Sequence, residues 1–136
     1  MAYSFYSHLA FLPPSSNADL AVLKNHLETF YARPVITDKP KIILNGKQIT
    51  VTFKDGYNFY IYLSEEKHVN QEALEIAEDL EEDWNEKPFD KEKLKASNKR
   101  FELWGDQDFD MDYFNDSLFI VNQIEKFDDV IIFQNH

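Results

Sequence analysis

The chain has 136 residues and no cysteine, a length typical of one domain and a composition that excludes disulfides, thiolate metal sites and cysteine nucleophiles. Its 14 basic and 25 acidic residues give a net charge of −11, the wrong sign for a phosphate backbone, so we expect no direct contact with nucleic acid. The sequence contains no apolar run long enough to cross a membrane and no secretory signal, and we expect a single cytoplasmic domain over residues 1–136 without membrane contact.

The acidic charge is concentrated in the second half of the chain. Residues 1–63 contain six basic and four acidic side chains, a net charge of +2, whereas residues 64–136 contain eight and twenty-one, a net charge of −13. A hydrophobic content of 43% and an aromatic content of 15% are typical of chains with a packed core. We therefore expect the acidic side chains to lie on the surface of a fold.

The first half of the chain predicts a helix followed by three antiparallel strands. After an aromatic N-terminal stretch, Ser16 or Asn17 is the candidate N-cap of a helix that ends at Arg33-Pro34 and has an apolar stripe formed by Leu20, Leu23, Leu27, Phe30 and Tyr31. Residues 41–63 contain three strand-like runs separated by the hairpin signals Asn45-Gly46 and Asp55-Gly56. They indicate a β-meander with one face in the core, and we expect Tyr57, Tyr60 and Tyr62 to lie in the core or at its edge rather than on an exposed platform.

The second half predicts an acidic amphipathic helix from Asn70 to Trp84, followed by a strand, a helix and a strand. The acidic helix has an apolar stripe of Val69, Ala73, Ile76, Ala77, Leu80 and Trp84. A short helix begins after Pro88-Phe89-Asp90, a strand spans 100–104, a helix runs from about 112 to 127, and the last strand spans 130–133. If these last two strands are parallel neighbours, the sheet is mixed. The predicted fold class is α+β, with helices packed on that sheet.

Two acidic segments are candidate partner-binding surfaces. Three consecutive carboxylates, Glu81 to Asp83, oppose the helix dipole at the end of the acidic helix, and such a conflict can mark a binding face. The segment 106–112 has aspartates at alternate positions, more than a helix cap requires. The candidate partner-binding residues are Glu75, Glu78, Asp79, Glu82, Asp83, Asp106, Asp108, Asp110 and Asp112.

The same aspartates also raise the alternative of a metal site formed by Asp106, Asp108 and Asp110. Aligned with an EF-hand loop, the segment has Met111 where the turn needs glycine and Ser117 where a bidentate glutamate is needed. Magnesium needs fewer carboxylates, but no phosphate-binding group accompanies them. In the simpler interpretation, Asp110 or Asp112 caps the following helix and the positive helix N-terminus stabilises the rest.

No catalytic constellation is recognisable in the sequence. The four histidines (His8, His26, His68 and His136) have no metal-ligand spacing, and there is no Gly-x-Ser-x-Gly nucleophile motif. Glu102 with Asp106 or Asp108 could form an acid/base pair, yet a chain with 25 carboxylates supplies such pairs by chance. All three glycines lie at predicted turns, which leaves no phosphate-binding loop. We predict no catalytic residue and no cofactor.

Four segments, Glu72–Ala77, Arg100–Glu102, Asp108–Asp116 and Val130–Phe133, resemble those of small bacterial proteins without an assigned function. This resemblance covers about half of the chain and implies a bacterial origin and a shared fold. In size, acidity and lack of catalytic groups the chain is also similar in type to bacterial immunity proteins, which are small acidic inhibitors that cover the active sites of basic nuclease toxins.

These observations lead to one main hypothesis of function and two others. The main hypothesis is a non-catalytic domain that binds a basic protein partner through its acidic face, as a monomer or homodimer. The alternative is a metal-dependent enzyme or metal-binding protein that uses the 106–112 segment together with Glu102. The third is a homo-oligomer formed through exposed aromatic side chains, which the charge of the chain opposes.

Overall fold

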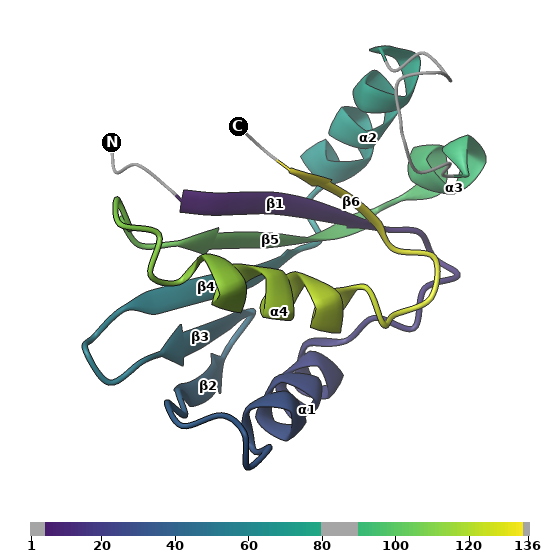
Figure 1. Ribbon diagram of the computed structural model, residues 1–136. Helices are drawn as coiled ribbons and strands as arrows, with labels where there is room; N and C mark the ends of the chain where they lie inside the picture. Colours follow the sequence, from purple (N-terminus) through teal and green to yellow (C-terminus); the bar gives the residue numbers. More distant parts are fainter. Residues whose placement is uncertain (1–4, 80–89, 135–136) are drawn as a thin grey trace.

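The computed structural model describes residues 5–79 and 90–134, which form one six-stranded sheet with helices on both of its faces (Figure 1). This arrangement confirms the α+β fold class. The elements of the first half are β1 (Phe5–Leu12), α1 (Leu20–Tyr31), β2 (Lys41–Asn45), β3 (Gln48–Thr52) and β4 (Asn58–Ser64). Those of the second half are α2 (Lys67–Asp79), α3 (Lys91–Ala96), β5 (Lys99–Gly105), α4 (Phe114–Ile124) and β6 (Ile131–Gln134).

The strand order is β2-β3-β4-β5-β1-β6, and every neighbouring pair is antiparallel. The predicted meander is confirmed as β2, β3 and β4. The expectation of a mixed sheet is wrong, because β1 lies between β5 and β6 and places Ala10 opposite both Phe101 and Ile132. The β5-α4-β6 segment is therefore a split β-α-β unit rather than a pair of parallel neighbours.

Helices α1 and α4 cover one face of the sheet and enclose the larger core. This core contains the fully buried side chains of Leu23, Leu27, Ile49, Phe59 and Phe101, and α4 adds Ile120 and Ile124. The predicted apolar stripe of α1 points into it, since Leu20, Leu23, Leu27 and Tyr31 are buried. Burying one such side chain contributes about 1.5–3 kcal/mol, so this face supplies most of the hydrophobic stabilisation.

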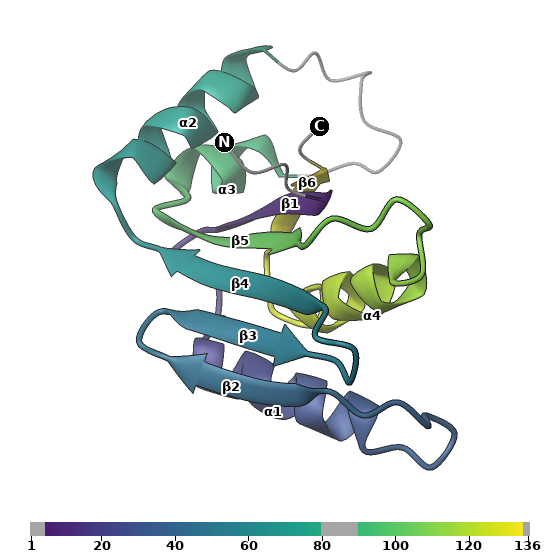
Figure 2. The same ribbon diagram turned by 90° about the vertical axis from the view of Figure 1, so that its left-hand side faces the viewer.

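Within residues 5–79 and 90–134, helices cover the opposite face at one end only. There α2 and α3 pack on β1 and β6 and form a second core of Phe11, Val69, Ala73, Ala77, Leu94 and Ile131. The α2 stripe is thus confirmed as far as Ala77, and the remainder of the predicted helix, with Glu82 and Asp83, lies outside the described residues. Figure 2 shows α1 behind β2 and β3 and no described helix in front of them. On this uncovered face Tyr60 and Tyr62 are half-buried, while Tyr57 is buried beside the larger core.

The residues predicted to cap two of the helices are wrong. Asp19 is the N-cap of α1 and accepts a hydrogen bond from the Val22 backbone N at 3.1 Å. Ser16 Oγ instead accepts from the backbone N of Ala18 at 3.3 Å, and Asn17 Oδ1 accepts from that of Asp128 at 2.8 Å. Helix α4 begins after Tyr113 without a side-chain cap, so neither Asp110 nor Asp112 caps it.

The start of α3 and the two hairpin turns match the sequence closely. Asp90 caps α3 through the backbone N of Glu92 and Lys93, as the Pro88-Phe89-Asp90 signal predicts. Gly46 and Gly56 have φ values of 62° and 90°, which the two hairpin turns require and which glycine adopts without strain. None of the described helices is long and apolar enough to span a bilayer.

Candidate binding site

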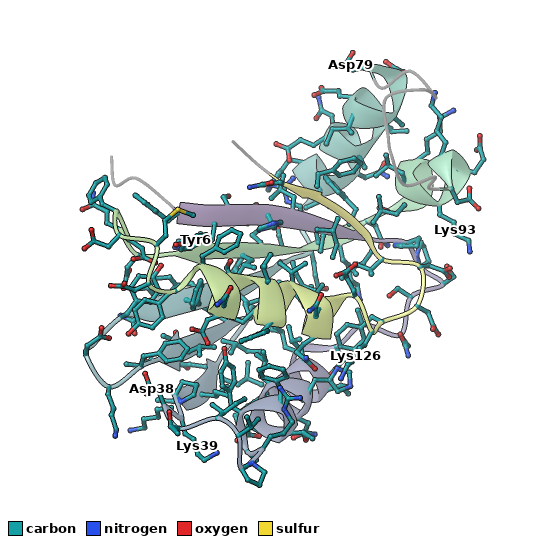
Figure 3. The ribbon with its side chains drawn as sticks, in the orientation of Figure 1. Tyr6, Asp38, Lys39, Asp79, Lys93 and Lys126 are labelled. Atoms are coloured by element: carbon teal, nitrogen blue, oxygen red, sulfur yellow. The ribbon has the colours of Figure 1, made fainter. Side chains whose placement is uncertain are left out.

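A groove of about 650 Å³ lies between α2 and the uncovered face of the sheet. The described part of α2 contributes Glu72, Glu75 and Asp79 to its lining, and β5 contributes Glu102. Glu75 and Asp79 are exposed and lie one helical turn apart, which places both carboxylates on the same face of α2. In Figure 3, Asp79 lies at the outer end of α2, far from α1 and α4.

Arg100 is the one cation that lines this groove among the described residues. Arg100 is 7% exposed, and its guanidinium donates to Glu102 Oε2 through Nε at 2.7 Å and to Glu72 through Nη1. It also lies over the Phe11 ring, 5.6 Å from the centroid. Arg100 is shared between Glu72 and Glu102, whereas Glu75 and Asp79 have no cationic partner among the described residues, so the lining of the groove has a net negative charge.

Trp104 forms an aromatic side of the groove. Its indole stacks on the Tyr60 ring with centroids 5.3 Å apart and planes 22° apart. The Tyr60 hydroxyl in turn donates to Asp106 Oδ1 at 3.0 Å, and the Asn58 backbone N donates to Asp106 Oδ2 at 2.9 Å. Asp106 therefore holds the aromatic pair in place instead of presenting a free carboxylate.

Asp108 is buried and organises the loop that precedes α4. It is 7% exposed, and its carboxylate accepts hydrogen bonds from the Tyr6 hydroxyl at 2.7 Å and from the backbone N of Asp112 at 3.0 Å and of Tyr113 at 2.7 Å. Figure 3 shows Tyr6 beside β1 and α4. Three donors around one buried carboxylate make Asp108 a structural residue, since a charged acceptor strengthens each hydrogen bond.

Other tyrosine hydroxyls also donate hydrogen bonds to aspartate residues. Tyr31 donates to Asp116 Oδ1 at 2.8 Å, and Tyr57 donates to the backbone O of Asp106 at 2.8 Å. Burial, followed by the neighbouring aspartates, raises the pKa of Tyr6, Tyr31 and Tyr57 above the ordinary value. Burial likewise raises the pKa of Asp116. These hydroxyls therefore stay protonated and keep donating at neutral pH.

The predicted site residues thus separate into three groups. Glu75 and Asp79 line the groove, and Glu78 is exposed on the same helix. Asp106 and Asp108 hold the loop, whereas Asp110 and Asp112 are exposed. Glu82 and Asp83 lie outside the described residues. The acidic face is therefore not one continuous surface within the described chain.

The metal and acid/base arrangements find little support in this geometry. Within residues 5–79 and 90–134, no group of three or more His, Asp or Glu side chains could hold a metal ion. The carboxylates of Asp106 and Asp108 belong to separate hydrogen-bond networks, and Glu102 is bonded to Arg100. His8 contacts the Tyr6 backbone O, His26 packs on Phe127, and His68 lies beside Glu66.

Sequence reasoning missed Arg100 and Trp104 as groove residues. Both alternate with Phe101 and Leu103 along β5, a signal that places them on the face opposite the larger core. What the sequence did not reveal is that the described part of α2 lies over one end of that face, because the position of a helix over a sheet depends on packing between distant elements.

Comparisons with protein families, with curated proteins and with solved structures gave no match to this chain.

Proposed function

We propose that this chain is a non-catalytic protein-binding domain whose groove between α2 and β5 binds a basic segment of a protein partner. The observation that carries the proposal is the composition of the groove, in which Glu75 and Asp79 have no cationic partner within the described part of the chain and Trp104 offers an aromatic ring. A partner arginine fits this chemistry, because its guanidinium pairs with carboxylates and also stacks on an indole.

The charge of the whole chain supports the same class of partner. With a net charge of −11, the protein attracts a basic surface over a distance of about one Debye length and repels other acidic chains. The role we propose is that of a bacterial, cytoplasmic inhibitor similar in type to immunity proteins, which cover a basic site on their target. On that account the gene for the target lies next to the gene for this chain.

Affinity capture from extracts of the source organism tests this proposal. The wild type is compared with the double variant Glu75→Lys/Asp79→Lys and with a control, Glu125→Lys/Asp128→Lys, which makes the same change in net charge on exposed residues that do not line the groove. We expect a specific partner that high salt releases and that only the groove variant fails to retain. Absence of a partner, or one indifferent to salt and to the groove variant, contradicts the proposal.

The structure separates the substitutions that test binding from those that test folding. Charge reversal at Asp108 would test folding rather than binding, because this carboxylate is buried under three hydrogen-bond donors. Reversal at Glu75 and Asp79 alters only exposed side chains.

A further inference from the structure

The loop between β5 and α4 exposes large apolar side chains that the groove does not involve. Phe109 is 77% exposed and Met111 is 56% exposed, and α4 adds Phe114 and Leu118, which lie one turn apart on the outer face of the helix. The Phe5 ring meets the Phe109 ring edge-on, with centroids 5.2 Å apart. We call these five residues the Phe109 patch. Exposed apolar side chains gathered on one loop and the helix that follows it mark an interaction site on an otherwise acidic protein.

The loop holds this patch in a fixed shape. Asp108 binds the backbone N of Asp112 and Tyr113, its backbone O accepts from Met111 N at 3.1 Å, and Met111 O accepts from Phe114 N at 3.3 Å. Met111 has a φ of 59°, a left-handed conformation that is unfavourable for a side chain of this type. The hydrogen bonds maintain this conformation even though the Met111 side chain remains in water. An apolar anchor fixed in advance loses less conformational freedom when it binds.

The charges around the patch indicate what it contacts. Asp110 and Asp112 are exposed and alternate in sequence with Phe109 and Met111. In a two-fold contact with a second copy, these carboxylates would face identical carboxylates on a chain of net charge −11. A partner with lysines and arginines around an apolar pocket meets both the aromatic ring and the carboxylates favourably.

We propose that the Phe109 patch is a preformed anchor that inserts into an apolar pocket bordered by lysine and arginine on a folded protein partner. This proposal rests on the geometry of the loop and does not depend on the groove. The two surfaces can therefore be tested separately. Phe109 is the central contact, because exposed aromatic residues on rigid supports contribute most to the affinity of such interfaces.

Photo-crosslinking identifies the occupant. Phe109 is replaced by p-benzoylphenylalanine in cells of the source organism, and Val35, which is 79% exposed and lies far along the chain in another loop, receives the same replacement as a control. We expect one adduct with a different protein at position 109 and none at position 35. No adduct above the control, or an adduct between two copies of this chain, overturns the proposal.

The affinity of the purified adduct partner then tests the anchor itself. We expect Phe109→Ser to weaken binding by about thirtyfold, Asp110→Lys/Asp112→Lys to slow association, and Val35→Ser to change neither. The melting temperature of Phe109→Ser should stay within about 2 °C of the wild type, because the side chain is mostly exposed. Unchanged affinity of Phe109→Ser, or a large loss of its thermal stability, overturns the proposal.

Discussion

Helix α2 and the loop at residues 106–112 are both acidic, yet the structure uses their carboxylates in different ways. Glu75 and Asp79 on α2 face a groove and have no hydrogen-bond donor that compensates them among the described residues. Asp106 and Asp108 in the loop accept hydrogen bonds from tyrosine hydroxyls and backbone N–H groups. A run of like charges therefore shows that a segment is acidic, and only its packing shows whether the carboxylates are available to a partner.

The largest effect we expect comes from high pH, which removes two buried hydroxyl donors, that of Tyr57 to the loop and that of Tyr31 to Asp116 in the following helix. Tyr31 and Tyr57 are buried, and their pKa values are raised because burial disfavours the phenolate. Their stabilisation is complete below about pH 10, the ordinary value, and is lost as the pH rises above it, by about 1.4 kcal/mol per pH unit for each residue. The free energy of unfolding should fall by about 4 kcal/mol between pH 9 and 11.5.

Urea denaturation at a series of pH values, together with tyrosine absorbance, measures this loss. The phenolate absorbance should appear together with unfolding. A free energy of unfolding that stays flat above pH 10 would show that the hydroxyl donors are dispensable.

Replacing Asp108 with asparagine is expected to have the next largest effect. Asparagine keeps one acceptor oxygen but places an NH₂ group against donors, at a site that is 7% exposed. We expect a loss of about 3 kcal/mol in the free energy of unfolding, because hydrogen bonds to a charged group are lost. The matched control is Asp110→Asn two residues away, which is exposed and should change stability by less than about 0.5 kcal/mol. Equal effects of the two variants would remove the distinction between structural and free aspartates.

Arg100→Met tests the ion pairs that Arg100 forms with Glu72 and Glu102 in the groove. The variant leaves Glu72 and Glu102 without their shared cation, while the partial exposure of both glutamates limits the penalty. We expect a loss of about 2 kcal/mol, smaller than for a fully buried ion pair. Adding Glu72→Gln and Glu102→Gln should recover part of the loss, and no recovery would mean that packing of Arg100 on Phe11 is the dominant contribution.

We expect the smallest effect on stability when the exposed carboxylates of α2 are removed. Glu75→Gln/Asp79→Asn removes two exposed carboxylates and should alter the free energy of unfolding by less than about 0.5 kcal/mol. Thermal and urea denaturation measure it. A loss comparable with that of Asp108→Asn would place these residues among the structural ones.

The sequence predicted the elements with clear local patterns. The meander follows from two glycine turns and alternating strands, and the α2 stripe follows from helical spacing up to Ala77. Strand β1 was not predicted, because it lies between β5 and β6 with apolar residues on both faces and shows no alternation near Ala10, Phe11 and Leu12.

The candidate site was predicted only in part, because some of its residues follow a clear local pattern and others do not. The acidic residues of α2 are visible in the sequence as the polar side of an amphipathic helix. The burial of Asp108 depends on Tyr6, 102 positions away, and on a loop shape that no local pattern reveals. Contacts between distant parts of the chain therefore decide which acidic residues are free.

Fluorescence of Trp104 tests the division between the two acidic segments most directly. Trp84 and Trp104 are the two tryptophans, so Trp84→Phe leaves Trp104 as the reporter in the groove, titrated with a hexa-arginine peptide. We predict a saturable signal that Glu75→Lys/Asp79→Lys weakens by about tenfold and that Asp110→Lys/Asp112→Lys, with the same change in net charge, leaves within about twofold. Equal weakening by both variants would contradict the account, because net charge alone would then explain the binding.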